Sequence, residues 1–541
     1  MEEQGLVYAG EHITWEHCGD LDGRPLECST IHVPMDQFDA SNSGGKTFSI
    51  PLIRQRGRGI SGDARADLPN LLLNPGGPGG SGINFMYRRG ALLRAVVGEG
   101  VHLLSFDPRG VNGSRPRASC YPDVETRRQR AIVRSSRVIE DSTEAYAWSY
   151  NYVRACADTM GEHGLYLNTP QTAADMNSIL DAVGQDAMVY WGFSYGTLLG
   201  QTYATLFPER AQRVIIDGVA NQFDWYEGLL DAEVFADTEN VWDGFLDECV
   251  KAGKERCALV ALIAASPAHQ ATGGKEILRE RLAALGTQLQ ASPSSIYVNN
   301  TVYGALSYET IWYKAIFMAL YKPATWHALA DALAKMIEGN ATAALLAYGL
   351  DEPWGETGDD LVNFVTYNDG ASGASYWQQD RQWLLELLVP YMNESVFTPS
   401  EYGGYYIKQQ WHIPRTHSYV PRTGVQTAHP LLLLSTTFDP VCPLVSARSA
   451  QAAFEGSQIV EVLGYGHCSV AMPSMCLARH VRAFLYNGTL PDTYTQCEVD
   501  GPYFVRPEAS GKVVAQRHFD DPTESSIHLA QLELARDWVW R

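Results

Sequence analysis

Residues 190–197 read Tyr-Trp-Gly-Phe-Ser-Tyr-Gly-Thr and place Ser194 inside a Gly-x-Ser-x-Gly pattern. The preceding residues, 186–191, predict a short buried strand, and residues 197–207 predict a helix that ends before Pro208. A serine between a strand and a helix is typical of a nucleophile elbow, in which small flanking residues lift the hydroxyl above the end of a sheet. The alternative is a flexible surface turn, because so short a pattern also arises by chance.

Strand-like and helix-like segments alternate around this turn. Residues 28–34 and 47–53 predict an antiparallel opening pair, and residues 71–74, 101–106 and 213–217 predict buried strands. Such alternation favours a mostly parallel sheet with helices on both faces, which is an α/β fold.

The pattern changes after the elbow region. From about residue 221 the chain is rich in amphipathic helical stretches and aromatic residues, and a core strand recurs only at 429–435, followed by another at 459–463. We therefore predict a helical insertion between two strands of the core. The predicted domains are a core of residues 1–220 and 429–541, with a C-terminal extension over 500–541, and a helical lid over 221–428.

Bulk composition limits the possible partners. At 541 residues the chain is too long for one compact core without a large insertion. Its formal charge of −21 disfavours nucleic acid or an anionic membrane surface as a partner. No apolar run approaches the ~20 residues needed to cross a bilayer, so we expect no membrane partner. The oligomeric state stays open.

Ten cysteines and several glycosylation sequons favour a disulfide-bonded secretory protein. Close sequence pairs are Cys18/Cys28, Cys120/Cys156, Cys249/Cys257 and Cys468/Cys476, with Cys442 and Cys497 left over. The sequons lie at Asn112, Asn299, Asn340, Asn393 and Asn487. The first residues lack the basic and apolar regions of a signal peptide, so we expect that a signal was removed; a reduced cytosolic enzyme is the alternative. No C-x-x-C pair occurs, and we expect no metal.

A serine nucleophile needs a base and an acid that orients the base. In proteins with this elbow, both follow the serine, each in a loop after a core strand. A strand over 431–438 leads into Asp439, and a later strand leads through Gly-x-Gly into His467. We therefore predict the triad Ser194, Asp439 and His467. Asp217 and Asp107 also end strands, but Asp107 opens an Asp-Pro-Arg-Gly turn, where a structural role fits better.

The glycine-rich loop 74–82, Asn-Pro-Gly-Gly-Pro-Gly-Gly-Ser-Gly, follows a core strand at the place where such proteins supply one oxyanion donor. Glycines let the main chain approach a reacting carbonyl closely. The second donor would be the N–H of Tyr195. A phosphate-binding loop is the competing interpretation, but the loop lacks the Gly-Lys-Ser/Thr ending and the dinucleotide fingerprint. We expect no cofactor.

Four motifs in this order resemble the tripeptidyl-aminopeptidase-like branch of the proline iminopeptidase family. They are Pro-Gly-Gly-Pro-Gly-Gly-Ser-Gly at 75–82, Ser-Phe-Asp-Pro-Arg-Gly-Val-Asn-Gly-Ser at 105–114, Gly-Phe-Ser-Tyr-Gly-Thr at 192–197 and Gly-His-Cys-Ser at 466–469. The resemblance implies a secreted α/β-hydrolase whose Ser194, Asp439 and His467 form the triad and whose Gly77 and Tyr195 form the oxyanion hole. No signature is found in the lid, and Asn74 stands where proline iminopeptidases have histidine.

The expected activity is that of an exopeptidase which releases short N-terminal fragments through an acyl-enzyme. Its peptide substrate carries a free ammonium group, which needs a carboxylate partner. The candidate carboxylates are Asp224, Glu227, Asp231 and Asp369. The alternative is an esterase, lactonase or other acyl hydrolase acting on a small molecule, because one triad serves either leaving group. A catalytically inactive hydrolase fold used for binding is disfavoured by the presence of all three triad residue types.

Overall fold

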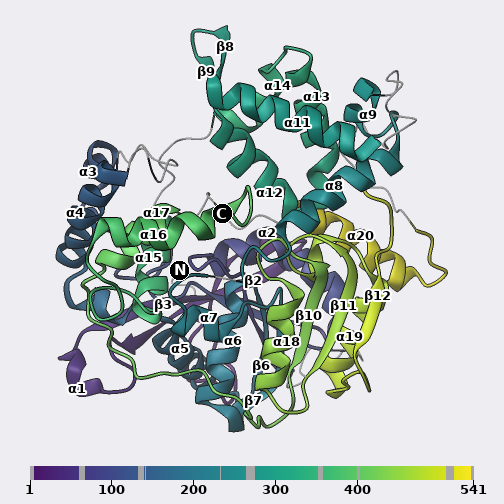
Figure 1. Cartoon of the computed structure of the whole chain (residues 1–541). Coiled ribbons are helices and arrows are strands. Elements are labelled where there is room, and N and C mark those ends of the chain that lie inside the picture. The colour runs from purple at the N-terminus through teal and green to yellow at the C-terminus, as the bar shows by residue number, and fades with distance from the viewer. Residues whose placement is uncertain are drawn as a thin grey trace.

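A ten-stranded sheet runs through the molecule in the order β1-β2-β3-β5-β4-β6-β7-β10-β11-β12 (Figure 1). The computed structural model describes residues 5–59, 68–131, 139, 142–231, 233–263, 274–350, 358–398, 402–506 and 517–537. The strands are β1 (Glu16–Leu21), β2 (Arg24–Pro34), β3 (Thr47–Gln55), β4 (Asn70–Asn74), β5 (His102–Phe106), β6 (Met188–Phe193), β7 (Ala211–Asp217), β10 (Leu432–Phe438), β11 (Gln458–Tyr465) and β12 (Thr495–Glu498).

The sheet is antiparallel at its beginning and parallel over the rest. β2 pairs with β3 in antiparallel register, with Cys28 opposite Ile53, so the predicted opening pair is confirmed. From β5 to β12 every neighbouring pair is parallel. The strands β4, β5 and β6 are buried along their whole length, because helices cover both faces, and this burial explains their continuous apolar sequences. The predicted α/β fold with a mostly parallel sheet is confirmed.

Helices cover both faces of the sheet and alternate strand residues point toward each layer. On one face, Leu72 packs with residues of α5, α6 and α18; on the other, Leu71 and Leu73 pack with residues of α2, α19 and α20. The core helices are α2 (Gly82–Val97), α4 (Ser142–Met160), α5 (Thr169–Ala182), α6 (Tyr195–Leu206), α18 (Leu444–Ala453), α19 (Met475–Asn487) and α20 (Pro522–Asp537), with the short α1 (Ala40–Ser43) and α3 (Val124–Arg130).

The chain leaves the sheet after β7 and rejoins it at β10, and these strands are hydrogen-bonded neighbours. The intervening segment holds α7 (Gln222–Glu227), α8 (Thr238–Ala252), α9 (Ala258–Ile263), α11 (Gly274–Ala291), β8 (Ser294–Asn299), β9 (Val302–Leu306), α12 (Phe317–Leu320), α13 (Trp326–Ile337), α14 (Thr342–Ala344), α15 (Gly358–Asp369), α16 (Arg381–Met392) and α17 (Tyr402–Gln410). The β8–β9 hairpin was not expected. Among the described residues its two strands pair only with each other, and they are largely exposed, so their sequence lacks the alternating apolar pattern of a core strand.

The insertion forms two groups of helices (Figure 1). The group α8–α14, with the hairpin, contributes Trp242, Phe245, Trp312 and Trp326 to a second apolar cluster, which also takes in residues of α16 and α17. The group α15–α17 lies beside α3 and α4, and Phe364 of α15 belongs to the cluster of the sheet. We call these groups the upper lid and the side lid. The boundaries predicted for the lid stay a prediction.

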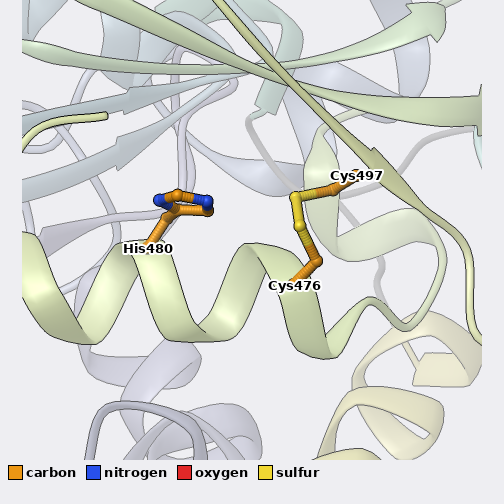
Figure 2. A group of neighbouring side chains, drawn as sticks. All are labelled: Cys476, His480 and Cys497. Atoms are coloured by element: carbon orange, nitrogen blue, oxygen red, sulfur yellow. A yellow bond between two sulfur atoms is a disulfide. The ribbon is translucent and has the colours of Figure 1, made fainter. Parts of the chain in front are cut away.

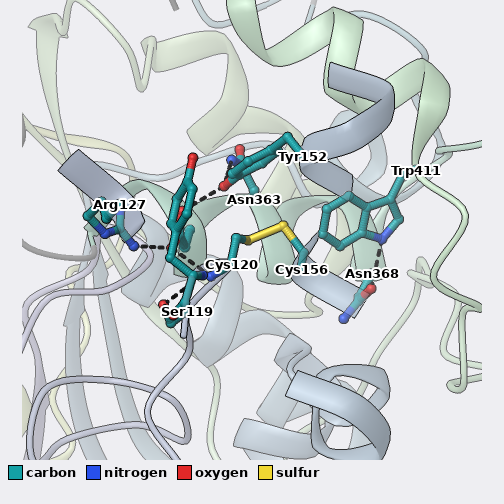
Figure 3. Close-up of a disulfide and its surroundings, with 10 residues drawn as sticks. Ser119, Cys120, Arg127, Tyr152, Cys156, Asn363, Asn368 and Trp411 are labelled. Atoms are coloured by element: carbon teal, nitrogen blue, oxygen red, sulfur yellow. Dashed lines mark hydrogen bonds and ion pairs between the residues drawn. A yellow bond between two sulfur atoms is a disulfide. The ribbon is translucent and has the colours of Figure 1, made fainter. Parts of the chain in front are cut away.

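The side lid is anchored at the disulfide Cys120–Cys156 (Figure 3). Asp360 of α15 is buried there and accepts hydrogen bonds from the Cys120 N–H at 2.8 Å and from the Tyr152 hydroxyl at 2.7 Å. Its carboxylate also forms an ion pair with Arg127. Because a buried charge is stable only when it is paired and hydrogen-bonded, these contacts fix α15 on the core.

The described residues contain four disulfides, of which three join the close sequence pairs Cys18–Cys28, Cys120–Cys156 and Cys249–Cys257. The fourth joins Cys476 to Cys497, because β12 lies beside β11 and brings Cys497 to the start of α19. Cys442 and Cys468 are buried free thiols. None of the described helices is both long enough and apolar enough to cross a membrane.

Candidate active site

Ser194 lies in a strained turn between β6 and α6. Its φ is 55° and its ψ is −123°, a backbone conformation that non-glycine residues rarely adopt. A Cβ at Gly192 would come within 2.4 Å of the Gly196 carbonyl oxygen, and a Cβ at Gly196 would lie 2.9 Å from Asn74 Oδ1. Only glycine fits at both positions, so the pattern has the strand–turn–helix context of a nucleophile elbow.

The structure brings Asp439 and His467 together. The Nδ1 atom of His467 lies 2.9 Å from each carboxylate oxygen of Asp439, and both side chains are fully buried. The N–H groups of Val441 and Cys442 donate to one carboxylate oxygen at 3.0 and 2.8 Å, and the N–H of Cys468 donates to the other at 2.9 Å. These donors hold the carboxylate in one orientation, and the carboxylate in turn orients the imidazole.

The rival carboxylates have other partners. Asp217, at the end of β7, accepts hydrogen bonds from the N–H and the hydroxyl of Ser469, both at 2.7 Å. Burial raises the pKa of Asp217 to about 6. Asp107 accepts a hydrogen bond from the Ser81 hydroxyl at 2.6 Å and from the Gly113 N–H at 2.9 Å. Asp107 thus stabilises the start of α2 and its own turn, while Asp217 fixes the loop that follows His467.

The Ser194 turn packs against the loop that carries His467. The N–H of Ser194 donates to the carbonyl of Asp217 at 2.9 Å. The next residue, Gly218, is so close to Cys468 that a Cβ there would lie 2.5 Å from Sγ. The Cys442 thiol lies within hydrogen-bonding reach of the Ser194 side chain. Serine, acid and histidine therefore come from three loops at one end of the parallel sheet.

The predicted oxyanion donors flank this turn. Gly77 has a φ of 118°, and a Cβ there would lie 2.7 Å from the N atom of Gly79, so the loop after β4 requires glycine. β4 and β6 are neighbours in the sheet, with Asn74 opposite Gly192. The N–H of Tyr195 lies in the first turn of α6, where N–H groups have no partner within the helix.

The Tyr195 side chain is held by a buried network that the sequence did not indicate. Its hydroxyl lies 2.6 Å from the Thr169 hydroxyl, which donates to Asp369 at 2.5 Å. Asp369 also accepts from the Thr169 N–H at 2.8 Å and from the Trp225 indole at 2.9 Å. The side chain of Asp369 is fully buried, and burial raises its pKa to about 7. The network joins the end of α15 in the side lid to the residue after the nucleophile.

The other candidate carboxylates lie on and after α7. Asp224 is half-buried, and burial, together with the neighbouring carboxylates of Asp231 and Glu233, raises its pKa to about 6. Glu227 is exposed. Trp225, next to Asp224, has its ring centroid 5.9 Å from that of Tyr195, which places α7 beside the elbow. Glu233 was missed because nothing in its sequence surroundings distinguishes it from a surface acid.

The upper lid contacts the loops of both Asp439 and His467. The Tyr321 carbonyl accepts a hydrogen bond from the His467 N–H at 3.0 Å, and the two rings lie edge to face with centroids 4.9 Å apart. At the start of α8, the Thr238 hydroxyl donates to the Pro440 carbonyl at 2.6 Å. No sequence signal marks these residues, since a main-chain contact does not depend on the side chain of its acceptor.

Two groups of side chains in the described part of the chain have the spacing of metal ligands. In the first group, the Cys476 and Cys497 sulfurs are bonded to each other beside His480 (Figure 2), so neither is available as a thiolate. The second group is Asp439, Cys442 and His467, all buried, with ligand atoms within 4.8 Å of one another. Cys442 was not singled out as a site residue from the sequence, although it follows Asp439 by only three positions.

Comparisons with known proteins agree with the fold. The family model "alpha/beta hydrolase fold" matches residues 69–254, and the model "TAP-like protein" matches residues 402–497. The chain is 27% identical to serine protease Hip1 of Mycobacterium tuberculosis over 90% of this chain and 91% of that protein. It is 33% identical to tripeptidyl aminopeptidase of Streptomyces lividans over 41% of each chain, and 25% identical to carboxylesterase B of Mycobacterium tuberculosis over 91% of each. The chain therefore has the α/β-hydrolase fold, matches the TAP-like family model over its C-terminal part, and is an enzyme of the serine hydrolase type.

Proposed function

We propose that this enzyme is a serine exopeptidase that releases short fragments from the N-termini of peptides. The observation that carries the proposal is the buried Asp439–His467 pair on loops that pack against the Ser194 turn. In a triad, the acid holds the histidine in the tautomer that accepts the serine proton. The strained turn and the paired imidazole are the two parts that acyl transfer requires.

The chemistry follows from these positions. His467 takes the proton of Ser194 as the hydroxyl attacks the scissile carbonyl, and the N–H groups of Gly77 and Tyr195 stabilise the oxyanion. His467 then donates the proton to the departing amine, and an acyl-enzyme remains on Ser194. Water, deprotonated by His467, releases the acyl group, and the proton returns to the serine.

Acidic residues beside the elbow favour a substrate with a free amino group. Burial and the neighbouring carboxylates of Asp231 and Glu233 raise the pKa of Asp224, and like charges around one carboxylate favour a bound cation. Lys408 is nearby, but its ammonium donates to the carbonyls of Gly228 and Leu229. We assign the α-ammonium of the peptide to Asp224 and Asp231. Asp369 is buried among three donors, so it fits a supporting role better than direct contact with the substrate.

The second candidate function is hydrolysis of small esters. It is favoured by the similarity to carboxylesterase B, which extends over 91% of this chain and therefore includes most of the lid. The same triad would act on an ester, and the acidic residues of α7 would then have no ammonium to bind.

A substrate panel separates the two functions. We expect cleavage of tripeptidyl and aminoacyl chromogenic amides with a free amino group, and weak cleavage of their N-acetylated forms. Asp224→Asn should lower kcat/KM for free-amine amides roughly tenfold or more, because it removes a charge-assisted hydrogen bond. The exposed Glu227→Gln variant is the matched control and should behave as wild type. Hydrolysis of blocked esters alone would overturn the peptidase proposal and leave the esterase.

We also propose that the enzyme works in an oxidising, secretory environment. Four disulfides support this proposal, since such bonds persist outside reducing compartments. The sequon asparagines Asn299, Asn340, Asn393 and Asn487 are exposed, whereas Asn112 donates to Ser81 and Asp107. Thiol titration of the denatured, unreduced protein from its native host should detect only Cys442 and Cys468. Titration of all the cysteines would instead indicate a reducing compartment.

A further inference from the structure

We propose that Asp439, Cys442 and His467 form a binding site for a soft divalent cation such as Zn²⁺ or Cd²⁺, and that the bound ion switches the enzyme off. Each of the three side chains offers one ligand atom, and these atoms lie within 4.8 Å of one another. The donor set is a carboxylate oxygen, a thiol sulfur and an imidazole nitrogen, the set that zinc takes in proteins. Small side-chain movements would bring them to bonding distance around one ion.

The surroundings of this site favour a divalent cation. The Cys442 thiol is buried, and the charges of Asp439 and Asp217 both act on it. Two buried carboxylates close to one sulfur raise the local preference for a cation. The Asp439–His467 contact adds a further element, since histidines that bind metals commonly donate their second ring N–H to a carboxylate. Asp439 therefore supports the ion either as a ligand or through the imidazole.

We place the route of the ion beside Ser194. Ser194 is partly exposed, whereas Asp439, Cys442 and His467 are buried. The Cys442 thiol lies within hydrogen-bonding reach of the Ser194 side chain, so an ion that enters there reaches a ligand of the site. On binding, the thiol releases its proton to solvent and sulfur becomes a thiolate ligand.

Inhibition follows from the chemistry of the triad. A coordinated imidazole cannot accept the proton of Ser194, so turnover stops while the ion is bound. Removal of the ion by a chelator restores the free imidazole and the activity. The inhibition rests on the proposed catalytic role of His467, but the binding of the ion does not.

The chain offers a matched control thiol. Cys468 is also buried and free, but its sulfur lies 3.4 Å from the Asp217 carbonyl oxygen and it does not belong to the ligand group. Cys442→Ala should therefore abolish the site, while Cys468→Ala should keep it. Thermal unfolding of both variants, measured without metal, shows whether each is folded.

The test combines direct binding with inhibition. Titration of the whole enzyme with Cd²⁺ should give the near-ultraviolet thiolate-to-cadmium absorption at one ion per chain in wild type and in Cys468→Ala, and none in Cys442→Ala. The concentration of Zn²⁺ that halves p-nitrophenyl ester hydrolysis should rise at least about tenfold in Cys442→Ala only, and a chelator should reverse the inhibition. Absorption that persists in Cys442→Ala, or is absent from wild type, would overturn the site. Binding without inhibition would leave the site standing and overturn its role as a switch.

Discussion

The sheet and the lid are held together in different ways. The strands join through continuous hydrogen-bond ladders, and apolar layers cover both faces. The upper lid packs in a second apolar cluster, which it shares with residues of α16 and α17, and it contacts the loops of Asp439 and His467 through Thr238 and Tyr321. The side lid reaches Tyr195, the neighbour of Ser194, through Asp369. Loops at the end of the sheet therefore carry Ser194, Asp439 and His467, and the lid contributes contacts that hold these loops.

The first prediction tests whether the chemistry belongs to the sheet alone. Ser194→Ala should lower kcat roughly 10⁴-fold or more, as removal of a triad nucleophile does in other enzymes. Peptide binding should survive, because the lid is unchanged. Isothermal titration with an uncleaved peptide measures whether binding survives. Labelling by a fluorophosphonate measures whether a reactive serine is still present. Fluorophosphonate labelling of the variant would contradict the assignment of the nucleophile.

The second prediction separates the two buried carboxylates of the sheet. Asp439→Asn should lower kcat about 10⁴-fold, because the histidine then adopts the wrong tautomer. Asp217→Asn should lower kcat far less, because Asp217 accepts hydrogen bonds from Ser469, whereas the Nδ1 atom of His467 contacts Asp439. Steady-state kinetics of both variants at one pH provide the comparison. Equal losses would mean that the acid has been assigned to the wrong residue.

The third prediction concerns the attachment of the side lid to the sheet. Asp360→Ala leaves the charge of Arg127 without its partner in a largely buried place, and it removes the acceptor of Tyr152. The free energy of unfolding should fall by about 3 kcal/mol. Urea unfolding measures this loss. The control is Glu227→Gln, a substitution at an exposed residue, which should leave the free energy of unfolding unchanged. An unaltered midpoint would show that the anchor contributes no stability.

The fourth prediction tests the contact between the side lid and the nucleophile turn. Thr169→Val preserves shape but removes the hydroxyl between Tyr195 and Asp369. A small shift of the Tyr195 N–H should lower kcat roughly tenfold with little change in KM. Thr169→Ser, which keeps the hydroxyl, should restore activity. Failure of serine to rescue would point to packing rather than to the hydrogen bond.

The smallest expected effect is on the pH dependence of stability. The folded-state pKa of Asp369 is about 7, above its ordinary value of 3.8, because burial disfavours the charged form. The folded chain binds this proton more tightly, so the contribution of Asp369 makes stability fall as pH rises from about 4 to about 7. Asp369→Asn should flatten this part of the slope. Melting temperatures of both proteins at about pH 5 and about pH 8 measure it, and parallel slopes would contradict the assigned burial effect.

The contrast between the regions also explains what could be predicted from sequence. The strands β4, β6 and β10 were predicted because fully buried parallel strands are continuous apolar runs that end in short functional loops. Asp439 and His467 follow such strands, so their position could be inferred from order alone. The hairpin β8–β9 and the contacts of Thr169 and Tyr321 were not predicted. They depend on long-range packing that leaves no local periodicity.

The C-terminal helix illustrates the same difference at the level of single residues. The sequence of the C-terminal segment predicts a helix with one apolar face, formed by Ile527, Leu529, Leu532, Leu534, Trp538 and Val539. The prediction is correct for Ile527, Leu532 and Leu534, which are buried in α20. It is wrong for Leu529, which is 39% exposed, while Trp538 and Val539 lie outside the described residues. An apolar side chain therefore indicates a helix face only on average, because periodicity does not define the width of the buried stripe.

The main-chain contacts of the upper lid limit how substrate preference can change. The carbonyl of Tyr321 holds the loop of His467, and the carbonyl of Pro440 is held by Thr238. Replacing the whole lid by that of a relative would exchange these supports, so we expect the transplanted enzyme to lose rate. Insertions and deletions are better tolerated at the β8–β9 hairpin, which is exposed and pairs only with itself. Engineering of new substrate preference should therefore keep the segments around residues 238 and 321 and vary the chain between them.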